Sequence, residues 1–344
     1  SNIKAYLTVN CVLYNEDIKS VEIIIKKAKQ IGVDAVIVWD PAAIVIARKI
    51  KIPFIISTQA NISNYQTALF YKKLGAKRVV LAREMNLKQI KLLKNKVGNL
   101  EIETFIHGAM CYSISGRCLF SAYLYGKSAN CGQCAQPCRK RWVLQNEEGD
   151  KIVSEGKYFL SAKDLCMIEH IPELIRSGIN AFKIEGRKRD PLYVEVTARC
   201  YREAIDSYFA KTFTKEKVAA WKRQLTDVYN RGFNTGFYFG DPSRDGISYD
   251  QADNLSPIKK ILIGYVKHYY SKIKVAEICF DHQGLVNGQQ IMIAGVQTYL
   301  TQTVDSMQIN GQKVSRASKG GLVGLLLNKP VKAGDKVFVL MARY

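Results

Sequence analysis

Residues 31–40 read IGVDAVIVWD, and the same pattern recurs at two later places in the chain. Residues 74–83 read LGAKRVVLAR, and residues 177–186 read SGINAFKIEG. In each phrase a glycine ends a helix, because glycine tolerates the positive φ found there. A short apolar strand follows and ends in polar residues. Apolar strands that alternate with amphipathic helices indicate parallel strands buried on both faces.

The same periodicity extends over the first two thirds of the chain. It predicts six strands, at residues 4–10, 34–39, 52–57, 78–83, 101–107 and 180–185. It also predicts a helix over 16–31, with Ile18, Val21, Ile24, Ile25 and Ala28 inward, and a helix capped by Asn86, with Leu87, Ile90, Leu93 and Val97 inward. A complete (β/α)8 barrel has eight strands in about 250 residues. We therefore expect an α/β fold over residues 1–225, an incomplete (β/α) TIM-type barrel that lacks leading βα units.

Three further regions follow from changes in the pattern. Residues 108–160 form a cysteine-rich insert that ends in a hairpin near Glu148-Gly149. Residues 190–225 are expected to be helical, and residues 226–256, rich in Gly, Asn, Asp and aromatics, form a connector. Residues 257–344 show short strands with turns at Asn287-Gly288, Asn310-Gly311 and Gly334-Asp335, which predicts a small all-β barrel.

The composition favours an anionic partner. The 344 residues are 47% hydrophobic and 24% charged, with 51 Lys and Arg against 30 Asp and Glu, a net charge of +21. That excess suggests nucleic acid, although solvated basic faces are the simpler explanation. No apolar run approaches the roughly 20 residues of a membrane span, and no secretory signal opens the chain. We therefore expect a cytoplasmic protein with reduced thiols and no membrane partner. The oligomeric state stays open.

Five of the nine cysteines fall between residues 111 and 138, namely Cys111, Cys118, Cys131, Cys134 and Cys138. Thiolates at this density usually share a metal or an iron–sulfur cluster. Zinc sites commonly pair two C-x-x-C knuckles and only one is present, so the spacing favours a cluster. A disulfide framework and buried thiols are the alternatives. The buried-thiol interpretation suits the isolated cysteines, namely Cys11, Cys200 and Cys279, and it leaves Cys166 open.

Polar residues follow the predicted strands, where the active sites of barrels lie. These candidates are Gln59, Asn61, Arg83, Glu84, His107, Lys183, Glu185 and Arg187. The arginines could hold a carboxylate by two hydrogen bonds each. Structural ion pairs at the barrel mouth, and a structural histidine at His107, are equally good interpretations.

Two basic runs stand beside these candidates, residues 139–142 (RKRW) and 187–189 (RKR). Both could grip a phosphate backbone. The aromatics Trp142, Phe233, Phe237, Tyr238 and Phe239 could stack flipped bases, although packing in the core is the commoner use of such rings.

Several of these motifs resemble one known family. ETFIHGAMC at 103–111, SGRC at 115–118, NCGQCAQPCR at 130–139, FKIEGR at 182–187, Tyr193-Val194 and NRGF at 230–233 look like the signature of the collagenase-like peptidase family U-32. The likeness covers nearly the whole chain. The family includes iron–sulfur proteins that hydroxylate RNA bases and relatives that hydroxylate quinone precursors, and this chain is most similar to the members that hydroxylate tRNA.

The resemblance implies a [4Fe–4S] cluster on Cys111, Cys118, Cys134 and Cys138, with Cys131 as a spare. It implies prephenate as co-substrate in place of free dioxygen, and 5-hydroxyuridine at the wobble position of tRNA as product. The carboxyl-terminal barrel resembles domain two of translation factors, which suits an RNA partner. The predicted roles are His107, Glu84 and Glu185 in catalysis; Gln59, Asn61, Arg83, Lys183 and Arg187 on the substrate; and Arg139, Lys140, Arg141 and Lys188 on RNA.

Other functions stay open at this point. A collagenase-like peptidase is the first alternative, although the sequence contains neither H-E-x-x-H nor G-x-S-x-G. Hydroxylation of ribosomal RNA or of another aromatic substrate is the second. A noncatalytic RNA-binding protein with a structural zinc is the third.

Overall fold

The computed structural model describes residues 3–152, 158, 160–248, 254–296 and 298–343. The chain divides into two compact units. The first unit comprises Ser1–Arg187, Ala198–Lys222 and Asn230–Leu255. The second unit comprises Lys188–Thr197, Arg223–Tyr229 and Ser256–Tyr344.

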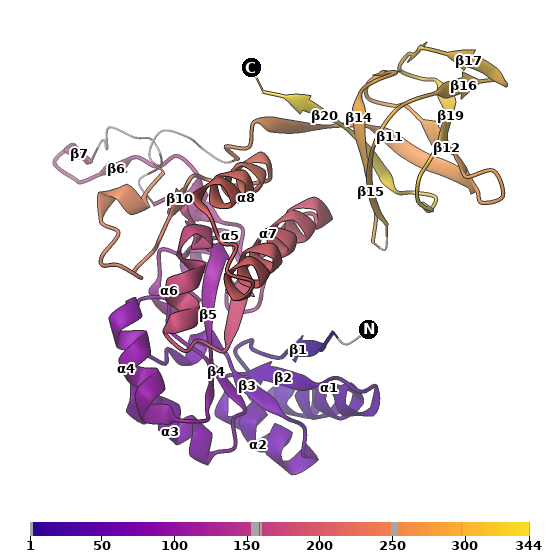
Figure 1. The fold of residues 1–344 in the computed structure, drawn as a ribbon. Coiled ribbons are helices and arrows are strands. Elements are labelled where there is room, and N and C mark those ends of the chain that lie inside the picture. The colour runs from indigo at the N-terminus through magenta and orange to yellow at the C-terminus, as the bar shows by residue number, and fades with distance from the viewer. Residues whose placement is uncertain (1–2, 153–157, 159, 249–253, 297, 344) are drawn as a thin grey trace. The chain divides into compact units, whose positions relative to one another are not determined.

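The first unit is built on one mainly parallel sheet (Figure 1). Its strands are β1 (Tyr6–Thr8), β2 (Ala35–Val38), β3 (Phe54–Ile56), β4 (Arg78–Val80), β5 (Glu101–Gly108), β8 (Asp164–Cys166), β9 (Ala181–Ile184) and β10 (Phe233–Asn234). Strands β1 to β5 pair in parallel in chain order, and β9 pairs in parallel with β5. All six predicted strands are therefore present, and the parallel α/β fold is confirmed.

Two strands of this sheet were not predicted. Strand β8 pairs antiparallel with β5, and β10 pairs in parallel with β8. They have only three and two residues, too few for a periodic pattern to show. Among the described residues, the pairing runs from β1 to β10 with β9 as a branch, and it does not close a ring.

The helices are α1 (Ile18–Gln30), α2 (Pro41–Ile50), α3 (Tyr65–Lys73), α4 (Leu87–Val97), α5 (Phe120–Tyr125), α6 (Ile171–Arg176), α7 (Pro191–Phe209) and α8 (Lys215–Asp227). Asn86 caps α4 through a reciprocal pair of hydrogen bonds with Gln89, as the sequence predicts. The predicted inward face of α1 is correct except at Ile24, which is exposed. None of the helices in the described parts of the chain combines the length and apolarity needed to cross a bilayer.

Most of the segment predicted as a connector, Asn230–Leu255, belongs to the first unit. Arg231 is 0% exposed and forms an ion pair with Asp164 at 2.6 Å. Two residues later, β10 adds to the sheet. The polar composition of this segment was therefore misleading, because its key arginine is buried against a carboxylate from another strand. Residues 249–253 of the predicted connector lie outside the described residues.

The predicted hairpin is present. Strands β6 (Leu144–Gln145) and β7 (Lys151–Ile152) pair antiparallel, and Gly149 in their turn has a φ of 91°. Residues 153–157 and 159 of the predicted insert lie outside the described residues.

The second unit contains an antiparallel β domain, as predicted. Its strands are β11 (Ile258–Tyr270), β12 (Val275–Cys279), β13 (Leu285–Val286), β14 (Gln290–Ala294), β15 (Tyr299–Thr303), β16 (Met307–Ile309), β17 (Gln312–Val314), β18 (Arg316–Ala317), β19 (Leu322–Leu326) and β20 (Lys336–Ala342). Eight of them pair in the order β15-β14-β20-β11-β12-β19-β16-β17 around a core that includes Ile263, Phe280 and Val337. Gly264 allows β11 to bend, because a Cβ there would lie 1.8 Å from the Cys279 carbonyl oxygen.

Candidate active site at the carboxyl ends of the strands

The cysteine segment, residues 109–139, leaves the end of β5 and packs against the ends of neighbouring strands. The Ser115 backbone N–H donates to Glu84 Oε1 at 2.9 Å, and the Ser115 hydroxyl donates to Asn61 Oδ1 at 2.7 Å. Ser115 is 2% exposed and has a φ of 48°. A serine in this left-handed region is strained, and the surrounding hydrogen bonds hold it there. The structure therefore brings two predicted site residues, Asn61 and Glu84, into contact with the cysteine segment.

A second set of contacts ties the segment to β2 and β3. The Arg117 guanidinium lies over the Trp39 ring, 4.7 Å from its centroid, and donates to the Gln59 carbonyl oxygen. The Gln59 side chain in turn accepts a hydrogen bond from Asn10 Nδ2 at 3.1 Å. The Gln59 carbonyl oxygen thus binds the cysteine segment, and the hydrogen bond from Asn10 orients the Gln59 side chain.

Arg187 reaches the same segment from the end of β9. A Cβ on Gly132 would lie 3.6 Å from Arg187 Nη1. The Cys11 thiol, which follows β1, interacts electrostatically with both Cys131 and Arg187. The ends of β1 and β9 therefore meet beside residues 131–132, with the exposed Arg187 between them.

All nine cysteines are free thiols. The Cys118 sulfur accepts a hydrogen bond from the Phe120 backbone N–H at 3.4 Å, and the Cys134 sulfur accepts one from Gln136 at 3.3 Å. Cys138 interacts electrostatically with Cys111 and Cys134; burial raises the pKa of its thiol, and the nearby Arg139 opposes that rise. Such amide and guanidinium donors suit thiolate ligands.

The five clustered thiols lie in one segment, but their sulfur atoms do not surround a common point. Within the described ranges, no group of three or more His, Cys, Asp or Glu side chains is arranged as a metal site. The residue types and the local hydrogen bonds fit four-thiolate ligation of a cluster or of zinc. The segment would have to draw its sulfurs together when it binds either one.

The four remaining cysteines differ in burial, and Cys279, predicted as a buried thiol, is half-buried. Burial raises the pKa of the Cys166 and Cys200 thiols to about 11, and both pack in the interior as inert groups. The prediction for Cys11 was wrong, because its side chain is exposed. Strand β1 ends at Thr8, two residues earlier than predicted, so Cys11 lies in the loop at the carboxyl end of the strand.

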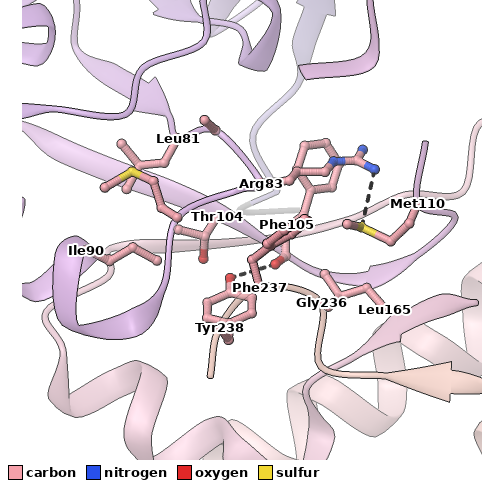
Figure 2. A pocket seen from close by; sticks show the side chains of 12 residues that line it. Leu81, Arg83, Ile90, Thr104, Phe105, Met110, Leu165, Gly236, Phe237 and Tyr238 are labelled. Carbon is pink, nitrogen blue, oxygen red and sulfur yellow. Dashed lines mark hydrogen bonds between the residues drawn. The ribbon is translucent and has the colours of Figure 1, made fainter. Parts of the chain in front are cut away.

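Arg83 lies at the base of the cysteine segment. Its guanidinium stacks on the Phe105 ring at 3.7 Å from the centroid, and Nη1 donates to the Ala109 carbonyl oxygen at 2.8 Å. Figure 2 shows Arg83 above a cavity whose other side is formed by Tyr238, with the Tyr238 hydroxyl bonded to the Phe105 carbonyl oxygen. The cavity has about 10 Å³, room for about one water, so it is not itself a substrate pocket.

His107, predicted to be catalytic, is buried against aromatic side chains. It is 1% exposed, its Nδ1 lies 3.3 Å from the Tyr201 hydroxyl of α7, and its ring packs against Tyr201 and Phe233. The pairing of β5 with β9 shifts register between Phe105 and His107. Such an irregularity re-aims side chains, and beyond it the His107 ring faces the helix.

Lys183, a predicted substrate ligand, forms an ion pair within the sheet. Its ammonium pairs with Glu103 at 2.8 Å, and Glu103, which is buried, also pairs with Arg78 at 3.0 Å. Arg78 completes the chain of charges with Glu101 at 2.7 Å. A buried carboxylate needs such partners, so the half-buried Lys183 ammonium is held by its pairing with Glu103.

The two glutamates at the site differ. The buried Glu84 Oε2 has no hydrogen-bond partner in the part of the chain that the structure describes. Buried polar atoms are nearly always bonded, so this oxygen is available to a ligand. Glu185 Oε1 accepts the Arg187 backbone N–H at 3.1 Å and thereby shapes the turn after β9.

Arg139 faces inward, contrary to the prediction that it grips RNA. Its guanidinium donates to the carbonyl oxygens of Ala162, at 2.6 Å, and Met110. Lys140 and Arg141 are exposed, and they donate hydrogen bonds to the hydroxyl groups of Tyr125 and Tyr158 respectively. Lys188, in the second unit, is also exposed.

Most of the aromatic candidates are packed. Trp142 contacts Phe120, with ring centroids 5.4 Å apart, Phe233 contacts His107, and Tyr238 is buried. Phe239 is different, because 54% of its surface is exposed.

Residues 1–248 match the sequence profile of peptidase family U32. The chain belongs to this family. Its relatives in the family include an uncharacterized protease of Methanocaldococcus jannaschii, 47% identical over 350 residues, which covers 99% of this chain and 85% of that protein. A collagenase of Porphyromonas gingivalis is 36% identical over 348 residues, covering 98% of this chain and 83% of that protein.

A third U32 relative bears a different kind of name. The tRNA hydroxylation protein P1 of Bacillus subtilis is 37% identical over 248 residues, covering 70% of this chain and 58% of that protein. The names of these U32 relatives therefore divide between cleavage of proteins and hydroxylation of RNA, and both are enzymatic activities.

Sequence patterns did not identify four residues that organise this U32 site: Ser115, Arg117, Asp164 and Arg231. The first two stand in the SGRC motif and the last in NRGF, so the motifs were a signal of importance. Their partners, among them Glu84, Trp39 and Asp164, lie 31 to 78 residues away, and no local pattern indicates those pairings.

Proposed function

We propose that this chain hydroxylates RNA, converting the wobble uridine of tRNA to 5-hydroxyuridine with a [4Fe–4S] cluster and prephenate. The observation that carries the proposal is the docking of the cysteine segment on the strand ends, through Ser115 to Glu84 and Asn61. Free thiols and polar groups thereby share the edge where barrel enzymes place their chemistry. The relative named for tRNA hydroxylation supports the choice of RNA as substrate.

Cys111, Cys118, Cys134 and Cys138 would hold the cluster, which when bound supplies the site with one-electron redox chemistry. The amide donors to Cys118 and Cys134 stabilise the charge on the sulfurs. Arg139, at one end of the segment, donates to the carbonyl oxygen of Met110 at the other end and to that of Ala162 outside it, and so positions Cys111 and Cys138.

Prephenate carries two carboxylates and therefore requires fixed cations. Arg83 and Arg187 are our candidates, one for each carboxylate. Among the described residues Arg83 forms no ion pair, and its guanidinium is already oriented by Phe105 and Ala109. Glu84 Oε2, which has no partner there, would accept a proton or a hydroxyl hydrogen bond from the substrate.

The target base must leave its stack to reach these groups. Lys140 and Arg141 would hold flanking phosphates, since both are exposed. Lys188, which is exposed in the second unit, is a further candidate for an RNA contact. Replacing C5–H of uridine by C5–OH adds one oxygen atom and removes two electrons from the base. We assign both roles to prephenate, whose ring C–OH would become C–H, so that a hydroxyl group is exchanged for a hydrogen. Such an enzyme would work in the cytoplasm, where tRNA is found and thiols stay reduced.

The test is complementation. Expressed in cells that lack tRNA hydroxylation, the chain should restore 5-hydroxyuridine, measured by mass spectrometry of tRNA nucleosides. Arg187→Ala should not restore it, whereas Lys183→Ala tests the structural assignment and should act only through stability. Normal modification by Arg187→Ala would remove that residue from the site.

Peptidase activity is the second candidate, because two of the relatives are named as a protease and a collagenase. The sequence offers no H-E-x-x-H or G-x-S-x-G motif to carry it. Cleavage of gelatin by cluster-free protein, lost on Glu84→Gln, would favour this function over hydroxylation.

A further inference from the structure

A surface hollow lies beside the candidate site in the first unit. It has about 500 Å³ and is lined by Asn86, Leu87, Lys88, Lys91, Tyr238, Phe239 and Gly240. The Leu87 backbone N–H donates to the Tyr238 carbonyl oxygen at 2.9 Å, so the start of α4 and residues 238–240 are held together. The Tyr238 side chain points away into the small cavity (Figure 2). The two segments that form the hollow are thus fixed to each other by the fold.

The charged residues that line the hollow are both lysines. Lys88 and Lys91 are exposed and lie three residues apart, on one face of α4. Neither forms an ion pair within the described ranges, and no residue that lines the hollow is acidic. Helix α4 contains no acidic residue in its sequence LKQIKLLKNKV. Its amino-terminal dipole therefore adds to the field of the two lysines.

The aromatic wall of the hollow is Phe239. Its ring packs against His170, with centroids 4.6 Å apart and planes inclined by 59°. That contact fixes the ring, yet 54% of the residue stays exposed. An oriented, half-exposed aromatic ring beside two unpaired cations has the chemistry of a nucleotide site, in which a base stacks and phosphates bind ammonium groups.

We propose that this hollow binds a single-stranded RNA segment, with one base stacked on Phe239 and phosphate oxygens bound by Lys88 and Lys91. Asn86 follows Arg83 by three residues and Glu84 by two, so the hollow opens at the same end of the sheet as the candidate site. A nucleotide held here would belong to the strand that flanks the modified base. The inference rests on the proposed RNA function and extends it to a residue set that the basic runs do not include.

The experiment measures RNA binding, which is independent of hydroxylation. The full chain is titrated into a fluorescein-labelled anticodon stem–loop RNA, and anisotropy is followed over a range of salt concentrations. Lys88→Ala with Lys91→Ala should lower the slope of log affinity against log salt by about 1.4, at about 0.7 per single-strand contact. Phe239→Ala should weaken binding by about tenfold, while Phe239→Trp should retain it.

The matched control is Lys27→Ala with Lys96→Ala, which removes the same charge from the last turns of α1 and α4. It should leave the salt slope within about 0.3 of the wild-type value. Equal effects of the two lysine pairs would overturn the inference, since only general surface charge would then be at work. If the wild-type chain binds RNA and the Lys88, Lys91 and Phe239 variants bind it equally well, the hollow is not the binding site, although the proposed RNA function would stand. Absence of RNA binding by the wild-type chain would overturn the proposed function with it.

A second measurement identifies the contact directly. The same RNA carrying 5-iodouridine in its loop should crosslink on irradiation to the peptide that contains Phe239, and mass spectrometry would locate the adduct. Displacement of the RNA by a poly-glutamate peptide that binds the Lys88 and Lys91 region more tightly would assign the hollow to an acidic protein partner and refute the RNA assignment.

Discussion

The Ser115 backbone N–H donates a hydrogen bond to Glu84 Oε1 at 2.9 Å, across 31 residues of sequence. This bond joins the left-handed turn of the cysteine segment to the end of β4. Glu84 therefore holds the segment with one oxygen, while its second oxygen is buried without a partner among the described residues.

Replacing Glu84 should loosen the cysteine segment. Glu84→Ala removes the acceptor of a buried N–H, which costs about 1.5–3 kcal/mol locally. Hydrogen exchange of the Ser115 amide should accelerate correspondingly. Glu84→Gln keeps an oxygen acceptor and should protect this amide better than alanine does. Equal exchange rates in the two variants would show that the carboxylate does not hold Ser115 in solution.

The cysteines should differ in their need for iron. Cys134→Ser should abolish iron binding by anaerobically purified protein, while Cys131→Ser should retain it, because only Cys134 belongs to the predicted ligand set. Iron analysis and the visible absorption spectrum would measure both. Comparable loss of iron in the two variants would contradict the assignment of ligands.

The buried pair Asp164 and Arg231 should contribute strongly to stability. Asp164→Asn leaves a buried guanidinium without its counter-charge and should cost about 3–5 kcal/mol. The exposed pair Arg202 and Asp206 is a suitable control, for which Asp206→Asn should cost about 0.3–0.5 kcal/mol. Calorimetric unfolding would compare them. Similar costs would mean that Arg231 relaxes to other partners.

Thiol labelling should follow burial. In cluster-free protein at pH 8, maleimide should modify the exposed Cys11, Cys111 and Cys131 first. The pKa of Cys166 and of Cys200 is raised to about 11, so both stay protonated at pH 8 and become thiolates only as the pH rises towards that value. Peptide mass spectrometry would order the rates. Early labelling of Cys200 would contradict its place in the core.

The basic runs should bind RNA through their exposed members. Reversing Lys140, Arg141 and Lys188 to Glu should weaken tRNA binding and flatten its salt dependence, whereas reversing three exposed lysines of α1 should not. Arg139→Ala should instead lower stability, because its guanidinium binds internal carbonyl oxygens. Filter binding and thermal unfolding would separate these effects. A loss of affinity without loss of stability in Arg139→Ala would restore that residue to the interface.

Local patterns were sufficient for the parallel strands, the cap at Asn86, the hairpin at Gly149 and the β domain after Ile258. In each case the signal is a periodicity or a turn residue within a few positions, and short-range backbone preference is enough to produce it. The crowding of cysteines between 111 and 138 was equally visible in the sequence.

Only the tertiary structure decided which polar residues at the strand ends face a site. His107 and Lys183 carry the same chemistry as other candidates, yet His107 is buried beyond a register shift in β5 and Lys183 is paired with the buried Glu103. Arg139 and Arg231 are turned inward by carbonyl and carboxylate groups distant in sequence. Orientation and pairing depend on contacts across tens of residues. A local sequence pattern cannot predict those contacts. A charged side chain is buried only where the fold places a partner beside it, and that partner is distant in sequence.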